Sequence, residues 1–253
     1  MWRYKVSRKY NNPPIVEALC EFQFVPSQPS DMTIPGLLYE KIKEEFPERR
    51  QQMGFGVGIQ PKEGGMTEQR FELAPPRMQF LRPDKSALVQ VGPDLLTINY
   101  LKPYPTWELF KPLILKNLEI YQAITKPKGF KRVGLRYINK IEFDEHPIEL
   151  TEYFNYYPFI PTTLPQMHET FQVRVEIPYE EGHDRLLLTL ASAIPEKPDV
   201  LSLLLDLDYI MAIPERIALN QVYDWIEKAH TTVENAFEAC ITDKCRSRFG
   251  EEK

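Results

Sequence analysis

The sequence predicts an α+β protein in which one curved, mostly antiparallel sheet carries two long helices on a single face. Short runs of alternating apolar and polar residues recur along most of the 253-residue chain, which is typical of strands with one buried face. The gaps between these runs are too short for parallel crossovers and therefore favour hairpins. Two longer stretches, around residues 106–126 and 220–242, repeat their apolar residues at helical spacing instead.

The first half of the chain, residues 12–126, begins with the alternating run "IVEALCEFQF", which predicts a strand. The segment "IPGLLYEKIKEEF" has apolar residues at helical spacing, and Pro47 ends the predicted helix. The glycine-rich residues 54–65 show no periodicity and predict a loop. A long helix from about Thr106 closes this half. Before it, strands are predicted at residues 69–74, 77–82, 87–91 and 95–101.

The second half, residues 129–245, repeats this order of elements. A strand and a short helix come first, and the run "FQVRVEI" then shows the most regular alternation in the chain. We expect Phe171, Val173 and Val175 in this run to point into the core. Two further strands, "RLLLTLASAI" and "LSLLLDLDYIM", precede a last helix that runs from about Asn220 to Thr242.

Both halves therefore read as a strand, a helix, several antiparallel strands and a long helix, with the break at Pro127–Gly129. We predict a single domain, residues 1–253, built by internal duplication of one unit. Its order of elements resembles the TATA-binding-protein-like topology. A shared topology implies no function by itself, because function depends on the site that a fold carries.

The composition is that of an ordinary globular protein, with 43% apolar and 26% charged residues. A net charge of −5 argues against nucleic acid as a partner, because a duplex-binding surface needs local positive charge. Cys20, Cys240 and Cys245 follow neither a disulfide framework nor a zinc spacing. We predict no cofactor and no metal. We expect a cytoplasmic protein, since neither a leader pattern nor a membrane-spanning apolar stretch is seen.

Glu17 and Glu21 share one predicted strand near the start of the chain. Four residues of strand separate their backbones by about 13 Å, whereas the paired carboxylates of glycoside hydrolases lie about 5 to 9.5 Å apart. The two glutamates are therefore not expected to be catalytic partners of each other. We interpret them as the wet side of a strand, from which either side chain can pair with a neighbouring strand.

Asp206 and Asp208 in "LLLDLDYI" are two residues apart, so both side chains leave the same face of a strand. Such a pair can contribute oxygen ligands to Mg²⁺ or Ca²⁺, but a solvated or salt-bridged face is the favoured interpretation. Arg136 and Arg174 are expected on that face, where they would neutralise the aspartates. With Glu21, these four residues form the candidate ligand-binding set.

Two polar residues fall among apolar neighbours. Asn139 does so within "LRYINKIEF", and we expect it to tie a neighbouring strand or loop, because a buried asparagine needs hydrogen-bond partners. His230 borders the apolar stripe of the last helix and is interpreted as a structural histidine, with titration near neutrality as the alternative. The sequence contains no phosphate-loop, G-x-S-x-G or H-E-x-x-H motif.

Three segments, "NPPIVEALCEF", "GLRYINKIEF" and "WIEKAHTTVENAFEACIT", occur in this order across nearly the whole chain. Together they resemble a sporadically distributed bacterial and archaeal family of uncharacterised proteins of this length. The resemblance implies mobile genes, such as those of defence islands or toxin–antitoxin loci, and it implies no catalytic role for any residue. The matching polar positions are Pro14, Glu17, Glu21, Arg136, Tyr137, Asn139, Trp225 and His230.

We therefore predict a non-enzymatic binding or interaction module that associates with a protein partner or with itself as a homo-oligomer. Its expected setting is an accessory or neutralising component of a mobile bacterial defence or toxin–antitoxin system. The alternative is a small-ligand or metal-binding sensor, or an enzyme, that uses the polar face of the sheet. The sequence leaves open whether any reaction is catalysed.

Overall fold

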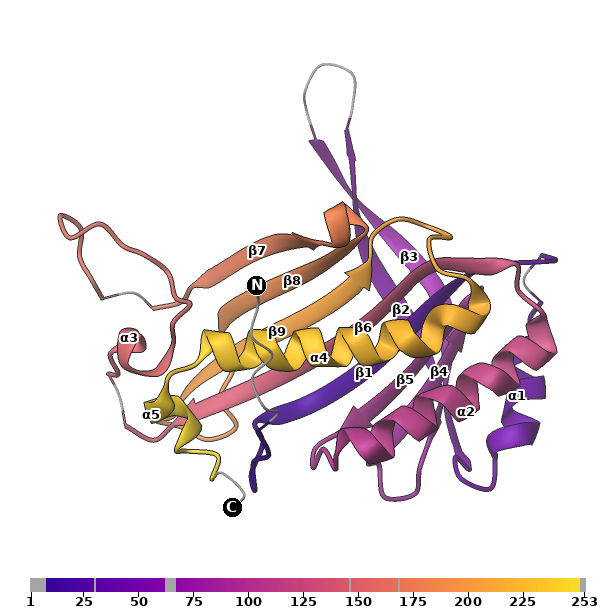
Figure 1. The fold of residues 1–253 in the computed structure, drawn as a ribbon, viewed down its shortest axis with the longest axis horizontal. Helices are drawn as coiled ribbons and strands as arrows, with labels where there is room; N and C mark the ends of the chain where they lie inside the picture. Colours follow the sequence, from indigo (N-terminus) through magenta and orange to yellow (C-terminus); the bar gives the residue numbers. More distant parts are fainter. Residues whose placement is uncertain (1–7, 30, 62–66, 146, 168, 251–253) are drawn as a thin grey trace.

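The computed structural model describes residues 8–250 except 30, 62–66, 146 and 168, and the side chains of residues 53–75 also lie outside the description. Within these residues, nine strands form one antiparallel sheet in the order β2-β3-β4-β5-β1-β6-β9-β8-β7, accompanied by five α-helices (Figure 1). The α+β class and the large antiparallel sheet predicted from the sequence are confirmed.

The elements have the following bounds. The strands are β1 (Ile15–Val25), β2 (Glu48–Pro61), β3 (Thr67–Leu81), β4 (Ala87–Gly92), β5 (Leu95–Leu101), β6 (Gly129–Phe143), β7 (Gln172–Tyr179), β8 (Asp184–Ala193) and β9 (Leu201–Met211). The α-helices are α1 (Ile34–Ile42), α2 (Trp107–Thr125), α3 (Leu150–Tyr153), α4 (Val222–Cys240) and α5 (Asp243–Arg246).

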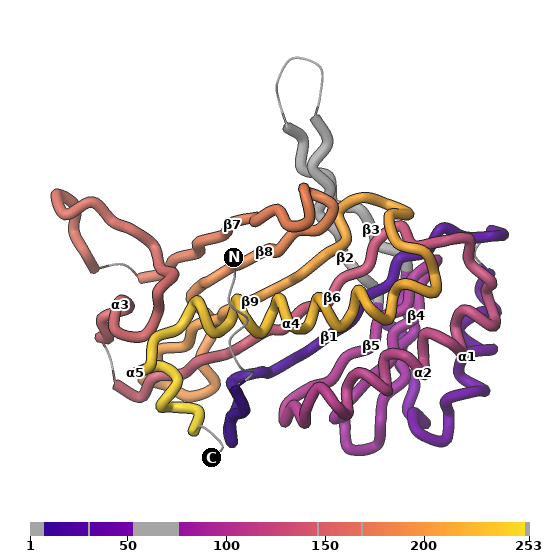
Figure 2. Tube along the Cα trace, in the orientation of Figure 1, coloured from indigo at the N-terminus to yellow at the C-terminus, as the bar shows by residue number. Residues whose placement is uncertain are grey.

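The long helices α2 and α4 cover the same face of the sheet, α2 over β5 and α4 over β9 and β6 (Figures 1 and 2). Alternation along β1 explains this arrangement, because Ala18, Cys20 and Phe22 are fully buried beneath the helices. The intervening Glu17 and Glu21 point the other way and stay partly exposed. We call the covered side the helix face and the opposite side the open face.

The two halves of the chain meet where β1 and β6 pair antiparallel at the centre of the sheet, with Glu17 opposite Ile138 and Phe22 opposite Val133. An aromatic cluster spans this junction on the helix face. Phe24 stacks on Tyr121 of α2, with ring centroids 4.6 Å apart, and also contacts Phe130 of β6. Residues of both halves therefore contribute to one hydrophobic core.

Two predictions for residues 54–82 are wrong. Residues 54–61, predicted as part of a loop, belong to β2 and pair with β3 from Gly54–Ala74 to Pro61–Thr67, while residues 62–65 lie outside the described residues. Glycine hides the side-chain periodicity but does not prevent backbone pairing. The strands predicted at 69–74 and 77–82 form the single strand β3, whose Pro75–Pro76 sits where the register with β2 shifts.

The expected burial of Phe171, Val173 and Val175 is met only in part, because Phe171 and Val173 are half-buried whereas Val175, further along β7, is exposed. Val175 lies opposite Leu188 and therefore points to the helix face, yet Val175 is 39% exposed and Ile177 is 37% exposed. The reason is position, because β7 is the outermost strand and α4 crosses β9 and β6 instead (Figure 1). Alternation predicted the direction of these side chains but not the absence of a covering layer.

Other expectations meet the structure only in part. Cys20, Cys240 and Cys245 are free and buried. Among the described helices, none combines the length and the apolar character that crossing a bilayer requires. Residues 1–7, which contribute to the expectation of no leader sequence, lie outside the described residues.

Candidate functional site

A network of charged residues lies on the open face around Arg132 of β6. Its guanidinium donates to Glu21 of β1 at 2.9 Å and to Asp208 of β9 at 3.0 Å, so it bridges three adjacent strands. The carboxylate side chains are only 16% and 15% exposed. Burial raises the pKa of Asp208, and the neighbouring arginines oppose this effect. Arg132 therefore compensates two carboxylates that would otherwise be poorly solvated.

The side chain of Arg132 can take this position because residue 134 is glycine. Gly134 stands between Glu21 and Ile210 in the register of the sheet. A Cβ atom at this position would lie 3.0 Å from a guanidinium nitrogen of Arg132. The absence of a side chain lets the guanidinium cross the strand to reach both carboxylates.

We expect Gly134→Ala to lower the free energy of unfolding by about 1 kcal/mol, because the new methyl group pushes Arg132 away from its partners. Gly36 of α1 provides the control, since no atom lies within 4 Å of the position its Cβ would take. Gly36→Ala should raise stability by about 0.5–1 kcal/mol through helix propensity. Urea unfolding compares the two, and equal effects of the same sign would refute the role assigned to Gly134.

Arg136 of β6 forms a second ion pair on the open face. Its Nε and Nη2 atoms donate to the two carboxylate oxygens of Asp206 at 2.7 and 2.5 Å, a bidentate geometry. Hydrogen bonding to Asp206 raises the pKa of Arg136. In the described part of the chain, no group of three His, Cys, Asp or Glu residues could hold a metal ion. Asp206 and Asp208 act here as partners of arginine, the interpretation that the sequence favoured.

The candidate set chosen from the sequence is brought together only in part. Glu21, Arg136, Asp206 and Asp208 share the open face, whereas Arg174 pairs with Glu176 at 3.1 Å on the edge strand β7. One strand, β8, separates Arg174 from Asp206, because both residues oppose Thr189.

Sequence reasoning missed Arg132, the residue that connects the set. A signal existed, since Arg132 and Arg136 are four residues apart on one alternating strand.

A chain of side-chain hydrogen bonds runs along the open face from β1 to β2. Asn99 of β5 donates to Glu17 at 2.6 Å, Gln90 of β4 donates to Asn99 at 2.9 Å, and Gln79 of β3 donates to Gln90 at 2.9 Å. Arg50 of β2 donates to Gln79 and completes the chain. Glu17 is therefore the end of a polar ladder across five strands. We call this ladder and the two ion-pair groups the polar lattice.

A cavity of about 410 Å³ lies on the other side of the sheet, between α2 and α4 and beneath residues 8–14. Its wall combines aromatic and other apolar groups with polar and charged side chains, and polar groups in an apolar wall can orient a small molecule. The principal lining residues are Tyr104, Trp107, Tyr137, Asn139, His230 and Glu234. We call it the interhelical cavity.

A line of polar contacts runs through the interhelical cavity. The Nε2 atom of His230 lies 3.5 Å from Glu234, its Nδ1 atom lies 3.3 Å from the hydroxyl of Tyr137, and this hydroxyl lies 3.1 Å from that of Tyr104. Trp107 stacks on the imidazole with ring centroids 4.0 Å apart. Burial lowers the pKa of His230 to about 4. The imidazole is therefore neutral at pH 7, with one nitrogen donating and the other accepting.

All but one of the polar positions that carry the family resemblance lie in the interhelical cavity or in the polar lattice. Pro14, Tyr137, Asn139 and His230 line the interhelical cavity, whereas Glu17, Glu21 and Arg136 belong to the polar lattice. Asn139 also donates to the carbonyl of Leu205 at 3.0 Å and so ties β6 to β9, as expected for a buried asparagine.

Trp225 lies apart from both places, because its indole nitrogen donates to Asp184 at 3.1 Å. Asp184 is 4% exposed and also accepts from the hydroxyl of Tyr209 at 3.0 Å and from Lys228 at 3.3 Å. This carboxylate joins α4 to the first residue of β8 and to β9. Its role is structural, and the sequence reasoning did not identify it.

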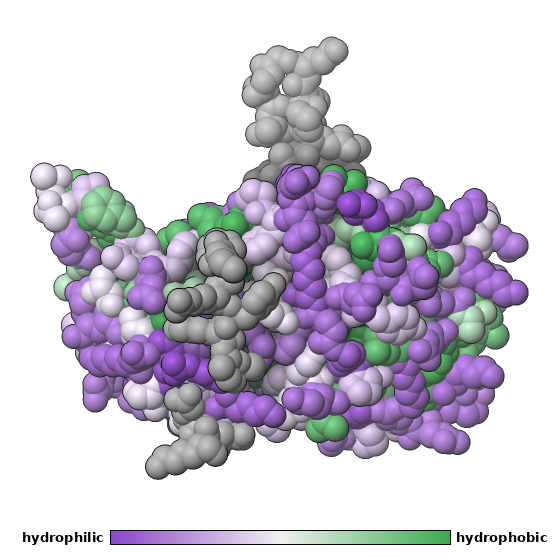
Figure 3. Space-filling view, viewed as in Figure 1, coloured by the Kyte–Doolittle hydropathy of each residue, from purple (hydrophilic) through white to green (hydrophobic). Residues whose placement is uncertain are grey.

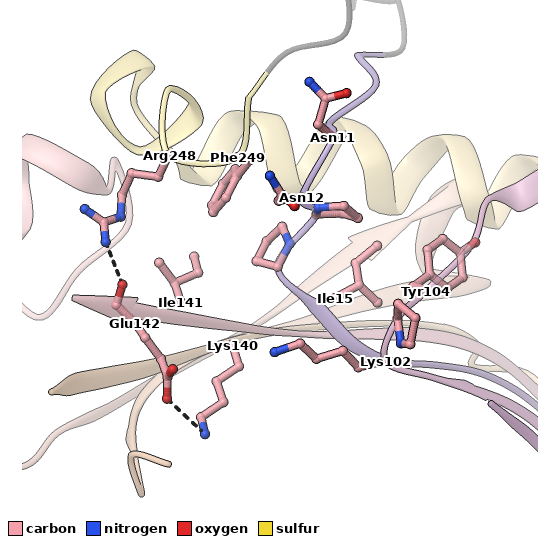
Figure 4. Close-up of a pocket in the computed structure, with 13 residues that line it drawn as sticks. Asn11, Asn12, Ile15, Lys102, Tyr104, Lys140, Ile141, Glu142, Arg248 and Phe249 are labelled. Carbon is pink, nitrogen blue, oxygen red and sulfur yellow. Dashed lines mark hydrogen bonds and ion pairs between the residues drawn. The ribbon is translucent and has the colours of Figure 1, made fainter. Parts of the chain in front are cut away.

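A second cavity, of about 640 Å³ (Figure 4), shares residues 13–15 and Tyr104 with the lining of the interhelical cavity. Lys102, Lys140, Arg248 and Glu142 contribute its charged groups. Lys140 pairs with the carboxylate of Glu142 at 3.2 Å, and Arg248 donates to the Glu142 carbonyl at 2.8 Å. Most of its positive charge is thus engaged within the protein.

Comparisons with known proteins add no assignment. A scan against models of protein families finds none that matches this chain. A search of curated proteins finds no significantly similar sequence. The family membership predicted from the sequence therefore stays a prediction.

Proposed function

We propose that this chain is a non-enzymatic binding module whose open sheet face receives a protein partner. The observation that carries this proposal is the polar lattice. In it, charged and amide groups of the adjacent strands β2, β3, β4, β5, β1, β6 and β9 already pair with one another. Groups held in place before binding lose little conformational entropy when a partner docks. The two cavities described above lie elsewhere, so an extended partner suits this face better than a small molecule.

The surrounding biology proposed for the module rests on the resemblance alone. We infer that it is an accessory or neutralising component of a mobile bacterial defence or toxin–antitoxin system. We also infer that the chain arose by duplication of one unit with a TATA-binding-protein-like order. The antiparallel pairing of β1 with β6, and a long helix that ends each half on the same face, support the duplication.

Size-exclusion chromatography with light scattering tests the function, using this chain mixed with the product of the adjacent gene. We expect one peak whose mass is the sum of the two proteins. An interface on the polar lattice should weaken as salt is raised, because charged groups lie at its centre. Separate elution of the two proteins at micromolar concentration in low salt would argue against the proposal.

A small-ligand sensor is the second candidate, and one observation favours it. Four family-like positions from three segments that lie far apart in the sequence converge on the interhelical cavity, and one of them is His230, whose pKa is strongly lowered. Shifted pKa values inside a cavity are a recognised mark of functional sites. This observation supports the alternative predicted from the sequence, and we propose the interhelical cavity on the helix face, instead of the open face, as its site.

Thermal unfolding with a panel of nucleotides and divalent metals tests the sensor. A ligand at about 100 times its Kd stabilises the folded state by about 2.7 kcal/mol, which raises Tm by roughly 5–10 °C for a chain of this size. His230→Gln should abolish the shift, while His183→Gln, outside the cavity, should keep it. An unchanged shift in His230→Gln, or no shift with any compound, would remove this candidate.

A further inference from the structure

Strand β7 ends the sheet with an unpaired backbone edge. The amide of Ser192 donates to the carbonyl of Phe171, so odd-numbered residues of this strand exchange hydrogen bonds with β8. The backbone groups of Gln172, Arg174 and Glu176 consequently point outward. Pro178 belongs to the outward set, where a residue without an N–H group costs no bond to β8. The edge is thus free for another strand within the described part of the chain.

The side chains of β7 are unusual for an edge left open to water. Val175 and Ile177 are exposed on the helix face, and Figure 3 shows apolar surface in the region of β7 and β8. Exposed, regular edge strands invite pairing with another chain, and proteins usually blunt them with charge. The described side chains of β2 at the opposite edge are polar or charged: Glu48, Arg49, Arg50, Gln51 and Gln52. Among the described side chains of these two edge strands, only those of β7 include apolar ones.

We propose that a second copy of this chain docks on β7, antiparallel, about a two-fold axis that passes through Val175. In this register Arg174 faces Glu176 of the second copy, and the same pair recurs on the other side of the axis. Val173 faces Ile177 of the second copy in the same way. Because 174 and 176 both belong to the outward set, they exchange both backbone hydrogen bonds. Charge and apolar contact fit this register, and the 174–176 pairs supply its backbone hydrogen bonds, whereas Pro178, which faces Gln172 of the second copy, donates none.

The pairing joins two sheets edge to edge and leaves the polar lattice uncovered. It therefore stands independently of the proposed partner-binding function, and either can fail without the other. A single pair of strands buries less surface than a permanent dimer interface needs. We expect a reversible dimer with Kd in the micromolar range, that is, roughly −8 kcal/mol.

Engineered cysteines test the register. Two Val175→Cys chains would meet on the axis with Cα atoms about 4.5 Å apart, which suits a disulfide. Two Ile177→Cys chains would be separated by four residues of strand, about 13 Å, and should not cross-link. Ile177→Cys mixed with Val173→Cys should cross-link. The native cysteines are buried and do not compete.

Copper phenanthroline as oxidant and intact-mass measurement report the products. Efficient cross-linking of Ile177→Cys with itself, or none in Val175→Cys, would overturn the proposed register.

Charge variants give a second test that needs no oxidant. Glu176→Arg sets like charges against each other on both sides of the axis and should raise the dimer Kd about tenfold or more. Adding Arg174→Glu restores opposite charges and should return Kd to within about threefold of wild type.

Light scattering over a concentration series measures each Kd, and circular dichroism checks the fold. A wild-type mass of 29.7 kDa at every concentration up to about 1 mM, well above a micromolar Kd, would overturn the proposal. So would a double variant that pairs no better than Glu176→Arg.

Discussion

Replacing Asp184 with alanine is expected to lower the free energy of unfolding by about 3 kcal/mol. The buried carboxylate accepts hydrogen bonds from Tyr209 and Trp225, and each donor left without an acceptor costs about 1–3 kcal/mol. Lys228 would also lose one of its acidic partners. Urea unfolding monitored by tryptophan fluorescence measures the loss, and because Trp225 is itself a reporter, circular dichroism should give the same midpoint.

Two controls isolate the hydrogen bonds of Asp184. Asp184→Asn keeps one carbonyl oxygen as an acceptor and should cost roughly 1 kcal/mol. Asp144→Ala removes an exposed carboxylate and should change stability by less than about 0.5 kcal/mol. If Asp184→Ala behaves like Asp144→Ala, then Asp184 does not anchor α4 to the sheet.

Lowering the pH from 7.5 to 4.5 is expected to remove about 2–3 kcal/mol of stability through His230 alone. Burial lowers the pKa of this histidine from 6.5 to about 4 in the folded protein, although Glu227 and Glu108 act in the opposite direction. Below pH 6.5 the unfolded chain therefore binds a proton that the folded chain does not yet accept. Stability present above pH 6.5 is lost progressively as the pH falls toward 4.

The variant His230→Gln isolates this contribution, since glutamine does not titrate. Wild type and variant should each lose stability in acid, because other carboxylates titrate in both proteins. The wild type should lose about 2–3 kcal/mol more between the two pH values. Parallel pH profiles in urea unfolding would show that His230 is not buried in its neutral form.

Alternation along single strands predicted which face most side chains occupy, because this periodicity is local. Glu17 and Glu21 were assigned to the wet side of their strand, and both lie on the open face. Their partners could not be predicted from the pattern. Asn99 and Arg132 reach them only through the pairing of β1 with β5 and β6, and strand order is a property of the whole fold.

Strand order also explains why the burial expected for β7 is met only in part. Its alternation is as regular as that of a buried strand, but its edge position leaves Val175 without a covering helix. The interhelical cavity could not be predicted from the sequence for a related reason. His230 was seen at the border of an apolar stripe, whereas Tyr104 and Tyr137, which complete the line of polar contacts, come from distant segments.

The most direct test of the polar lattice as a binding surface compares two ion pairs by calorimetry with the adjacent-gene product. Arg136→Ala/Asp206→Ala removes a pair from the open face, and Glu40→Ala/Lys43→Ala removes a pair, 2.5 Å apart, from the C-terminal end of α1 on the helix face. Deleting both partners avoids leaving an unpaired charge. We predict that the open-face variant weakens binding about tenfold or more and that the α1 variant stays within about twofold of wild type. Equal affinities for the two variants, or a loss confined to the α1 variant, would contradict the account.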